Sequence, residues 1–280
     1  MADVAIRRRS SRSLNLKYQP GFGTLAIVCL IMLYAPIVVL IAFSFNDNRS
    51  VAVWTHFSTD WYVSAFHNEE IRAAAWISLK LAFVATIVST VFATAAALAT
   101  TRTRAYRGMT AAYLVINQPL VVPEIITAIA TLSFFALLRT EAGIYFGFGN
   151  LILAHTVFCI PFAYMPIRAR LEDMDLTLEQ AAADLYATPW KAFQRITLPL
   201  LIPGIAAGAM LAFIVSFDDV IITAFVAGPG ETTLPIYIFG AIRRGVTPEI
   251  NAISTIVLAV SVMFVTLFYF VSRRGRDARR

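Results

Sequence analysis

Acidic residues within apolar stretches are the residues of this sequence whose chemistry most needs an explanation. Glu124 interrupts the otherwise uncharged segment 109–138, and Asp218 and Asp219 end another apolar run. An ionisable side chain at membrane depth costs several kcal/mol unless it faces a cavity or a partner, so such residues are candidates for function. Carboxylates bind ammonium groups through charge-assisted hydrogen bonds. We therefore expect Glu124, Asp218 and Asp219, with the neighbouring Phe217, to line a solute pathway.

Structural roles for the same acids stay open at this stage. Glu124 could make a buried hydrogen bond between helices, and the two aspartates could cap a helix or pair with Arg243 or Arg244.

Other chemistry finds little support in the sequence. No Gly-x-x-x-x-Gly-Lys-Ser/Thr phosphate loop is present, so nothing in this chain is expected to hydrolyse ATP. Cys29 and Cys159 lack metal-ligand spacing and are predicted to be packing residues. His155 is predicted to be an interior histidine, because no carboxylate or second histidine lies a turn away in the sequence. A Ser/His/Asp or metal-ligand cluster is also missing, which argues against an enzyme.

Composition indicates that the elements holding these residues are transmembrane helices. The 280 residues are 59% hydrophobic and 14% charged, and the mean hydropathy is +0.72. A water-soluble fold could not bury that much apolar surface. Six stretches reach the roughly 20 residues that a membrane-spanning helix requires. The predicted spans are about 21–45, 73–101, 109–138, 145–167, 198–226 and 249–272, all helical.

The distribution of basic residues predicts the orientation. Of the 23 Lys and Arg residues, 17 fall on the side that carries both termini, which places the basic tails 1–20 and 273–280 in the cytoplasm. The first span is too long for a signal peptide and is expected to be retained. Because the basic residues flank helices, the net charge of +6 indicates membrane topology and not nucleic-acid binding. Trp61 and Tyr62 would then lie outside, as membrane-belt aromatics or as docking residues for another protein.

The cytoplasmic connection 168–197 is longer and more patterned than the others. Thr177 is expected to cap a short amphipathic helix, with Gln180 reaching back to its start. Pro189 suits the first turn of a second short helix, 190–196, after an elbow at Ala187 and Thr188. We predict a pair of helices that either lies on lipid headgroups or docks a cytoplasmic partner.

A family resemblance favours docking. Gln180-Ala-Ala-Ala-Asp-Leu-Tyr186, then nine residues, then Ile196-Thr-Leu-Pro199, resembles the cytoplasmic EAA loop of binding-protein-dependent ABC importer permeases. Gln180 stands where the family usually has Glu, with Glu179 adjacent, and Tyr186 stands where it usually has Gly. Tyrosine does not favour a positive φ, so the elbow is expected either to be reshaped or to use the ring to fill a groove of the ATPase. The residues assigned to ATPase coupling by this resemblance are Glu179, Gln180, Ala181, Ala182, Asp184, Tyr186, Ile196, Leu198 and Pro199.

Further segments are similar to the spermidine/putrescine branch, and to the second of its two permeases. These are Phe45-Asn46, the aromatic segment 54–66, Ser216-Phe-Asp-Asp219 and Thr247-Pro-Glu-Ile-Asn251. The resemblance implies an inner-membrane subunit without a cofactor of its own. It also implies a related permease, two ATPases that bind ATP and Mg, and a periplasmic binding protein. A polyamine would need carboxylates for its ammonium ends and aromatic faces for its methylenes.

Alternatives remain at this stage. Related importers carry opines, amino acid derivatives, metal ions or sugars on the same fold. A proton-coupled secondary carrier would use Glu124 but should show internal repeats, and a scaffold protein would leave the acids unexplained. Gly204 and Gly208 form a small-residue face that marks either an internal packing seam or the contact with the partner permease.

Overall fold

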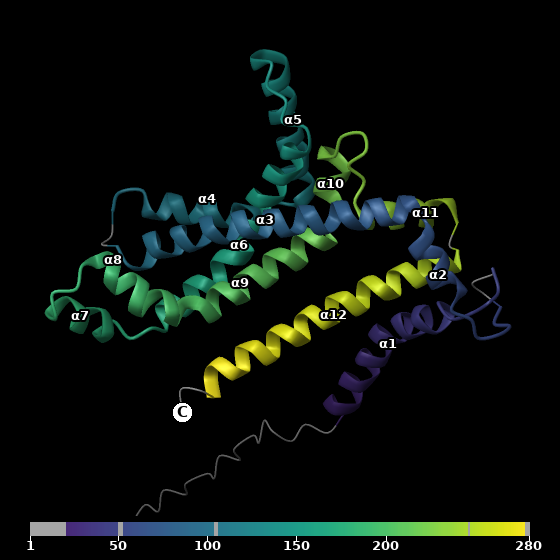
Figure 1. Ribbon diagram of the computed structural model, residues 1–280, viewed down its shortest axis with the longest axis horizontal. Helices are drawn as coiled ribbons and strands as arrows, with labels where there is room; N and C mark the ends of the chain where they lie inside the picture. Colours follow the sequence, from purple (N-terminus) through teal and green to yellow (C-terminus); the bar gives the residue numbers. More distant parts are fainter. Residues whose placement is uncertain (1–20, 50–52, 104–105, 246, 278–280) are drawn as a thin grey trace, which may run out of the picture.

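The computed structural model describes residues 21–49, 53–103, 106–245 and 247–277, and in these ranges the fold is all helical apart from one bridge between Asn46 and Phe57 (Figure 1). The predicted N-terminal tail 1–20 lies outside the described residues. The helices are α1 (Phe22–Phe43), α2 (Asp60–His67), α3 (Glu69–Thr101), α4 (Met109–Val121), α5 (Glu124–Ala142), α6 (Phe148–Glu172), α7 (Thr177–Asp184), α8 (Pro189–Ala192), the π-helical turn η1 (Phe193–Thr197), α9 (Leu198–Asp218), α10 (Ile221–Val226), α11 (Leu234–Arg244) and α12 (Pro248–Asp277).

Six helices in the described part of the chain are long and apolar enough to cross a membrane, as the sequence predicted. They are Phe22–Phe43, Glu69–Thr101, Glu124–Ala142, Phe148–Glu172, Pro189–Asp218 and Pro248–Thr266.

The third predicted span departs most from expectation. A single helix over 109–138 was predicted, but α4 ends at Val121 and α5 begins at Glu124. Pro123 has no N–H for the helix ladder, and its ring favours an extended Val122, whose ψ is 133°. The chain therefore turns at this point, and α5 rises steeply away from α3 and α4 (Figure 1).

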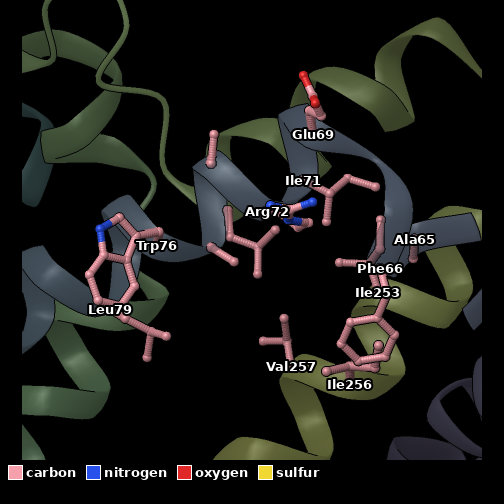
Figure 2. A pocket seen from close by; sticks show the side chains of 13 residues that line it. Ala65, Phe66, Glu69, Ile71, Arg72, Trp76, Leu79, Ile253, Ile256 and Val257 are labelled. Carbon is pink, nitrogen blue, oxygen red and sulfur yellow. The ribbon is translucent and has the colours of Figure 1, made fainter. Parts of the chain in front are cut away.

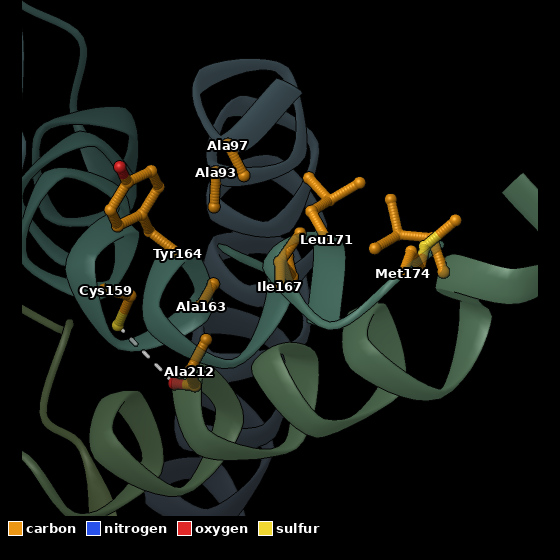
Figure 3. Packing of buried hydrophobic residues seen from close by; sticks show 10 residues of the cluster. Ala93, Ala97, Cys159, Ala163, Tyr164, Ile167, Leu171, Met174 and Ala212 are labelled. Carbon is orange, nitrogen blue, oxygen red and sulfur yellow. Dashed lines mark hydrogen bonds between the residues drawn. The ribbon is translucent and has the colours of Figure 1, made fainter. Parts of the chain in front are cut away.

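The packed centre of the molecule consists of α3, α6 and α9 (Figure 1). Small side chains let these helices approach one another, as Figure 3 shows for Ala93 and Ala97 of α3 and for Ala163 of α6. Cys159 is buried there and its Sγ donates to the carbonyl oxygen of Ala212, 3.4 Å away. The thiol is thus a packing residue, as predicted.

Gly204 and Gly208 form the seam between α9 and α6. A Cβ atom added at Gly208 would lie 2.5 Å from the Ala163 carbonyl oxygen, and one at Gly204 would lie 2.6 Å from Cβ of Arg170. Any larger residue would force the two helices apart. Of the two roles predicted for these glycines, the structure shows internal packing.

The first helix lies at the periphery. Its chief contact among the described elements is α12, and none of its side chains is buried (Figure 1). The segment that follows folds back on the end of α1, because Trp61 Nε1 donates to the Asn46 carbonyl oxygen at 2.9 Å and Tyr62 Oη lies 2.6 Å from Ser44 Oγ. Trp61 and Tyr62 therefore hold this segment in place.

Candidate functional site

Two interrupted helices meet at the acidic residues. α4 gives way to α5 at Pro123, and α9 gives way to α10 at Asp219, whose ψ of 132° is extended. α5 packs mainly against α10 (Figure 1). Non-helical backbone at membrane depth is tolerated where it is buried in protein or lines a cavity. The acids thus occur where the backbone leaves its regular hydrogen bonding.

Asp219 is used to start α10. Its Oδ1 accepts from the Ile222 amide at 3.2 Å, and its Oδ2 accepts from the amide and the hydroxyl of Thr223 at 2.9 and 2.8 Å. A carboxylate at this position satisfies amides that a helix start leaves without partners. The side chain is 1% exposed, so it presents almost no surface to a solute.

His155 of α6 completes this buried network. Its Nε2 lies 3.4 Å from Asp219 Oδ2 and 3.0 Å from Thr223 Oγ1, and its Nδ1 lies 2.9 Å from Ser216 Oγ. The prediction of an interior histidine is confirmed, since His155 is buried. No carboxylate lies a helical turn away in the sequence, and the one beside the ring is brought there by tertiary folding. Asp219 thus lies beside His155 and not beside Arg243 or Arg244, the partners that the sequence left open. Arg243 instead stacks on Phe239, with its guanidinium carbon 4.6 Å from the ring centre.

The other acids are more accessible. Glu124, the first residue of α5, is half-buried and interacts electrostatically with Asp219. Asp218 ends α9 with its side chain exposed. Phe217 is buried and stacks on Phe213, with ring centres 5.7 Å apart. Of the four residues predicted to line a pathway, Glu124 and Asp218 are therefore the two that are not buried.

Thr127 is a polar residue that the sequence analysis missed. It lies one turn after Glu124 on α5, and its buried hydroxyl has no hydrogen-bond partner within the described residues. Residues three apart on a helix share a face. Its spacing from Glu124 was a usable signal, and together they give α5 a polar face within an apolar helix.

A separate cavity of about 600 Å³ lies between α2, the start of α3, and α12 (Figure 2). Its walls are mainly apolar, including Leu79, Ile253 and Val257 (Figure 2). Glu69 and Arg72 are its only charged lining residues. The lining does not include the acids at the helix breaks, and it suits hydrocarbon better than a polycation.

The connection between α6 and α9 forms a projecting element, residues 173–197, which we call the knob (Figure 1). Its first helix, α7, starts differently from the prediction. Thr177 is a helical residue and not the cap, since its amide donates to Asp175 Oδ1 at 2.9 Å. The predicted return of the Gln180 side chain is not seen either, since α7 has no side-chain cap hydrogen bond and the Gln180 side chain is exposed.

The hydrogen bond that the Thr177 amide donates also lowers the pKa of the Asp175 carboxyl. The amide stabilises the charged form of the group.

Tyr186 forms the elbow of the knob. It has a φ of +57°, the only positive φ of a non-glycine residue in the described chain. The elbow thus keeps the left-handed shape that a glycine would adopt, at a cost of about 1 to 2 kcal/mol for a side-chain-bearing residue. The ring is 96% exposed and Leu185 beside it is 82% exposed. Two large apolar side chains therefore project from the tip of the knob.

The second helix of the knob, α8, is continuous with the fifth membrane span. Thr188 caps α8 by accepting from the Lys191 amide at 3.4 Å, and Pro189 occupies the first turn as predicted. α8 then runs through η1 into α9 as one helix, Pro189–Asp218, so the predicted separate helix 190–196 is the start of the fifth span. Pro199 cannot donate to the ladder and crowds the carbonyl four residues earlier, which accounts for the wider turn before it.

The remaining residues assigned to coupling fall on different faces. Gln180, Ala181, Asp184 and Pro199 are exposed; Glu179, Ile196 and Leu198 are half-buried; and Ala182 is 7% exposed, inside the knob. In the part of the chain that the structure describes, no group of His, Cys, Asp or Glu residues is arranged to hold a metal ion.

Residues 89–279 match the family described as binding-protein-dependent transport system inner membrane component. The chain is 39% identical over 255 residues to the putrescine transport system permease protein PotI of Escherichia coli K12, covering 89% of this chain and 91% of that one. It is 36% identical over 243 residues to the spermidine/putrescine transport system permease protein PotC of Haemophilus influenzae, covering 87% and 93%.

A solved structure shares the fold. A chain of a bacterial ABC transporter involved in the import of the acidic polysaccharide alginate matches with a TM-score of 0.69 and 18% identity, covering 90% of this chain and 93% of that one.

Proposed function

Because the chain belongs to the family of binding-protein-dependent transport system inner membrane components, we propose that the solute it helps to import is a polyamine such as putrescine or spermidine. The chain is a multi-pass inner-membrane permease subunit of an ABC importer and not an enzyme, since ATP hydrolysis resides in separate ATPase subunits. The importer also includes a periplasmic binding protein.

The observation that carries the solute assignment is the likeness to a putrescine permease along nearly the whole chain. The accessible acids agree with it. Glu124 and Asp218 lie at two helix breaks, and Thr127 adds a hydroxyl on the face of Glu124. A flexible dication can pair with carboxylates at both ends. We assign Glu124 and Asp218 to the pathway and Asp219 to the support of the break between α9 and α10.

We assign both termini and the knob to the cytoplasm, as the basic residues indicate. There the knob would dock one of two ATPases, and a related second permease would complete the pathway, because six helices enclose no wide channel alone. The exposed Leu185 and Tyr186 supply the apolar contact that a protein partner requires. Closure of the ATPases would push the knob and move the helices joined to it. The docking of the binding protein at Trp61 and Tyr62 stays a prediction.

Uptake into proteoliposomes tests the proposal. The vesicles would contain this chain, its partner permease and the ATPase, with ATP inside, binding protein outside, and radiolabelled putrescine or spermidine as solute. We expect uptake that requires both ATP and binding protein, and that excess unlabelled polyamine suppresses. Matched vesicles with a non-hydrolysable nucleotide are the control.

Other outcomes separate the alternatives. ATP hydrolysis that the binding protein stimulates, without polyamine uptake, would keep the importer but reject the polyamine, and opines, amino acid derivatives, metal ions and sugars would be tested next. Uptake by this chain alone, driven by a proton gradient, would overturn the importer assignment.

A further inference from the structure

Arg102 joins three elements at the base of the knob. It ends α3, and its Nε donates to Oε1 of Glu179 in α7 at 3.2 Å. One of its terminal nitrogens donates to the carbonyl oxygen of Leu171, near the end of α6, at 2.9 Å. The Arg102 side chain is 16% exposed and that of Glu179 is 25% exposed. A planar guanidinium with several fixed donors suits such a junction better than an ammonium group does.

Glu179 extends the junction to a fourth element. The same Oε1 accepts from the hydroxyl of Thr197, 2.9 Å away, in the wide turn η1 that leads into α9. Thr197 is 4% exposed, so this bond lies inside the protein. One carboxylate oxygen of Glu179, Oε1, therefore bonds to groups at the ends of α3 and η1.

The path of the chain shows why this junction matters. The knob is covalently continuous with α6 and α9, and motion of the knob reaches them through the backbone. α3 has no such connection. Beside the packing of α3 on α6 and α9, Arg102 adds one side-chain hydrogen bond from the end of α3 to the knob and one to α6. These bonds lie close to where Leu171 and Met174 pack in the core (Figure 3).

The other half of α3 contacts the opposite end of the protein. Ser78 accepts from the Leu234 amide at 2.7 Å, and this bond is buried. Leu234 starts α11, directly after the segment that follows α10. A shift of α3 along its axis would therefore displace the connection between the fifth and sixth spans.

We propose that Arg102 is a positioning residue for transport: it makes α3 move with the knob, so that ATP-driven motion reaches the outer connection around Leu234. This inference rests on the proposed importer function and adds a second route beside the covalent one through α6 and α9. Motion passes between distant sites through rigid elements that are packed together and that switch between two arrangements.

The test measures solute uptake and ATP hydrolysis in the same proteoliposomes, containing the complete importer. Arg102→Met removes the donors and keeps the length of the side chain. We expect the ATPase to copurify as with the wild type and ATP hydrolysis to continue, while uptake per ATP falls about tenfold, within the range typical of coupling between sites. The increase in hydrolysis caused by the binding protein should fall in parallel.

Two controls lie nearby. Arg107→Met removes an exposed charge from the same connection, and Glu172→Gln breaks the pair of Glu172 with Arg168, which lies within one helix. Both should retain wild-type uptake per ATP. The exchange of Arg102→Glu combined with Glu179→Arg should recover part of the coupling that either single variant loses.

The outcomes distinguish this inference from the proposed function. Equal loss in Arg102→Met of uptake and of the basal hydrolysis measured without the binding protein would overturn the role of Arg102. Unchanged uptake and unchanged stimulation of hydrolysis by the binding protein would overturn it as well. If the wild type shows hydrolysis stimulated by the binding protein but takes up no polyamine, the solute assignment fails and the stimulation still tests Arg102.

Discussion

Oδ2 of Asp219 lies 3.4 Å from Nε2 of His155, and each side chain is 1% exposed. The two residues come from different helices and together fix the break between α9 and α10. Asp218 precedes Asp219 directly, yet its side chain faces outward. Neighbouring carboxylates thus have different surroundings, and substitution should separate their contributions to stability and to uptake.

Asp219→Asn should lower the stability of the chain by about 1 to 3 kcal/mol, the usual cost of a buried hydrogen-bonding group left without its partner. Asp218→Asn should leave stability unchanged and reduce polyamine uptake. Thermal unfolding in detergent gives the first quantity and vesicle uptake the second. A stable Asp219→Asn variant that has lost only uptake would instead place Asp219 in the pathway.

Glu124→Gln should raise the polyamine concentration needed for half-maximal uptake by about tenfold, which corresponds to roughly 1.4 kcal/mol for one lost charge pair. The reason is that Glu124 is the accessible carboxylate at the start of α5. Glu141→Gln, an exposed change at the other end of the same helix, is the control. Equal effects of the two substitutions would argue against a specific role for Glu124.

Tyr186→Gly should stabilise the isolated chain by about 1 kcal/mol, because glycine adopts a positive φ without steric cost. Tyr186→Ala keeps the unfavourable backbone conformation and should show no such gain. Both variants lose the exposed ring and should copurify with less ATPase. If Tyr186→Ala binds the ATPase as tightly as the wild type does, the ring takes no part in docking.

Gly208→Ala should destabilise the chain by about 1 to 3 kcal/mol, as overpacking of a tight seam does. The added Cβ would meet backbone atoms of Ala163, which cannot rotate away. Gly240→Ala is the control, since its Cβ would meet only the end of the Arg244 side chain at 3.8 Å. Unfolding temperatures of the two variants in one detergent make the comparison.

The start of α7 should depend on pH through Asp175. The pKa of this carboxyl is lowered in the folded chain, so its contribution is complete above the pKa of the unfolded chain and is lost as pH falls through the folded value. We expect the Thr177 amide to lose protection from hydrogen exchange below about pH 4, near the usual aspartate pKa. In Asp175→Ala the protection of this amide should be low at every pH. The ratio of the exchange rates of the wild type and the variant cancels the intrinsic pH dependence of hydrogen exchange.

The sequence by itself determined the number of membrane spans and the presence of a patterned helical connection between the fourth and the fifth. Uncharged runs of this length can only be helices in lipid, and the spacing from Gln180 to Pro199 indicated the family that the chain matches. Pro123 signalled a weak point in the third span, although the sequence did not show that α5 would turn away there.

Only the tertiary structure decided what surrounds each of these charged side chains. Asp218 and Asp219 are chemically alike, and the extended backbone at Asp219 turns one carboxylate inward, onto His155 and the start of α10. Arg102 and Glu179 lie far apart in the chain and meet because the ends of α3 and α6 pack side by side. Such contacts depend on how helices pack in three dimensions, which local sequence periodicity does not encode.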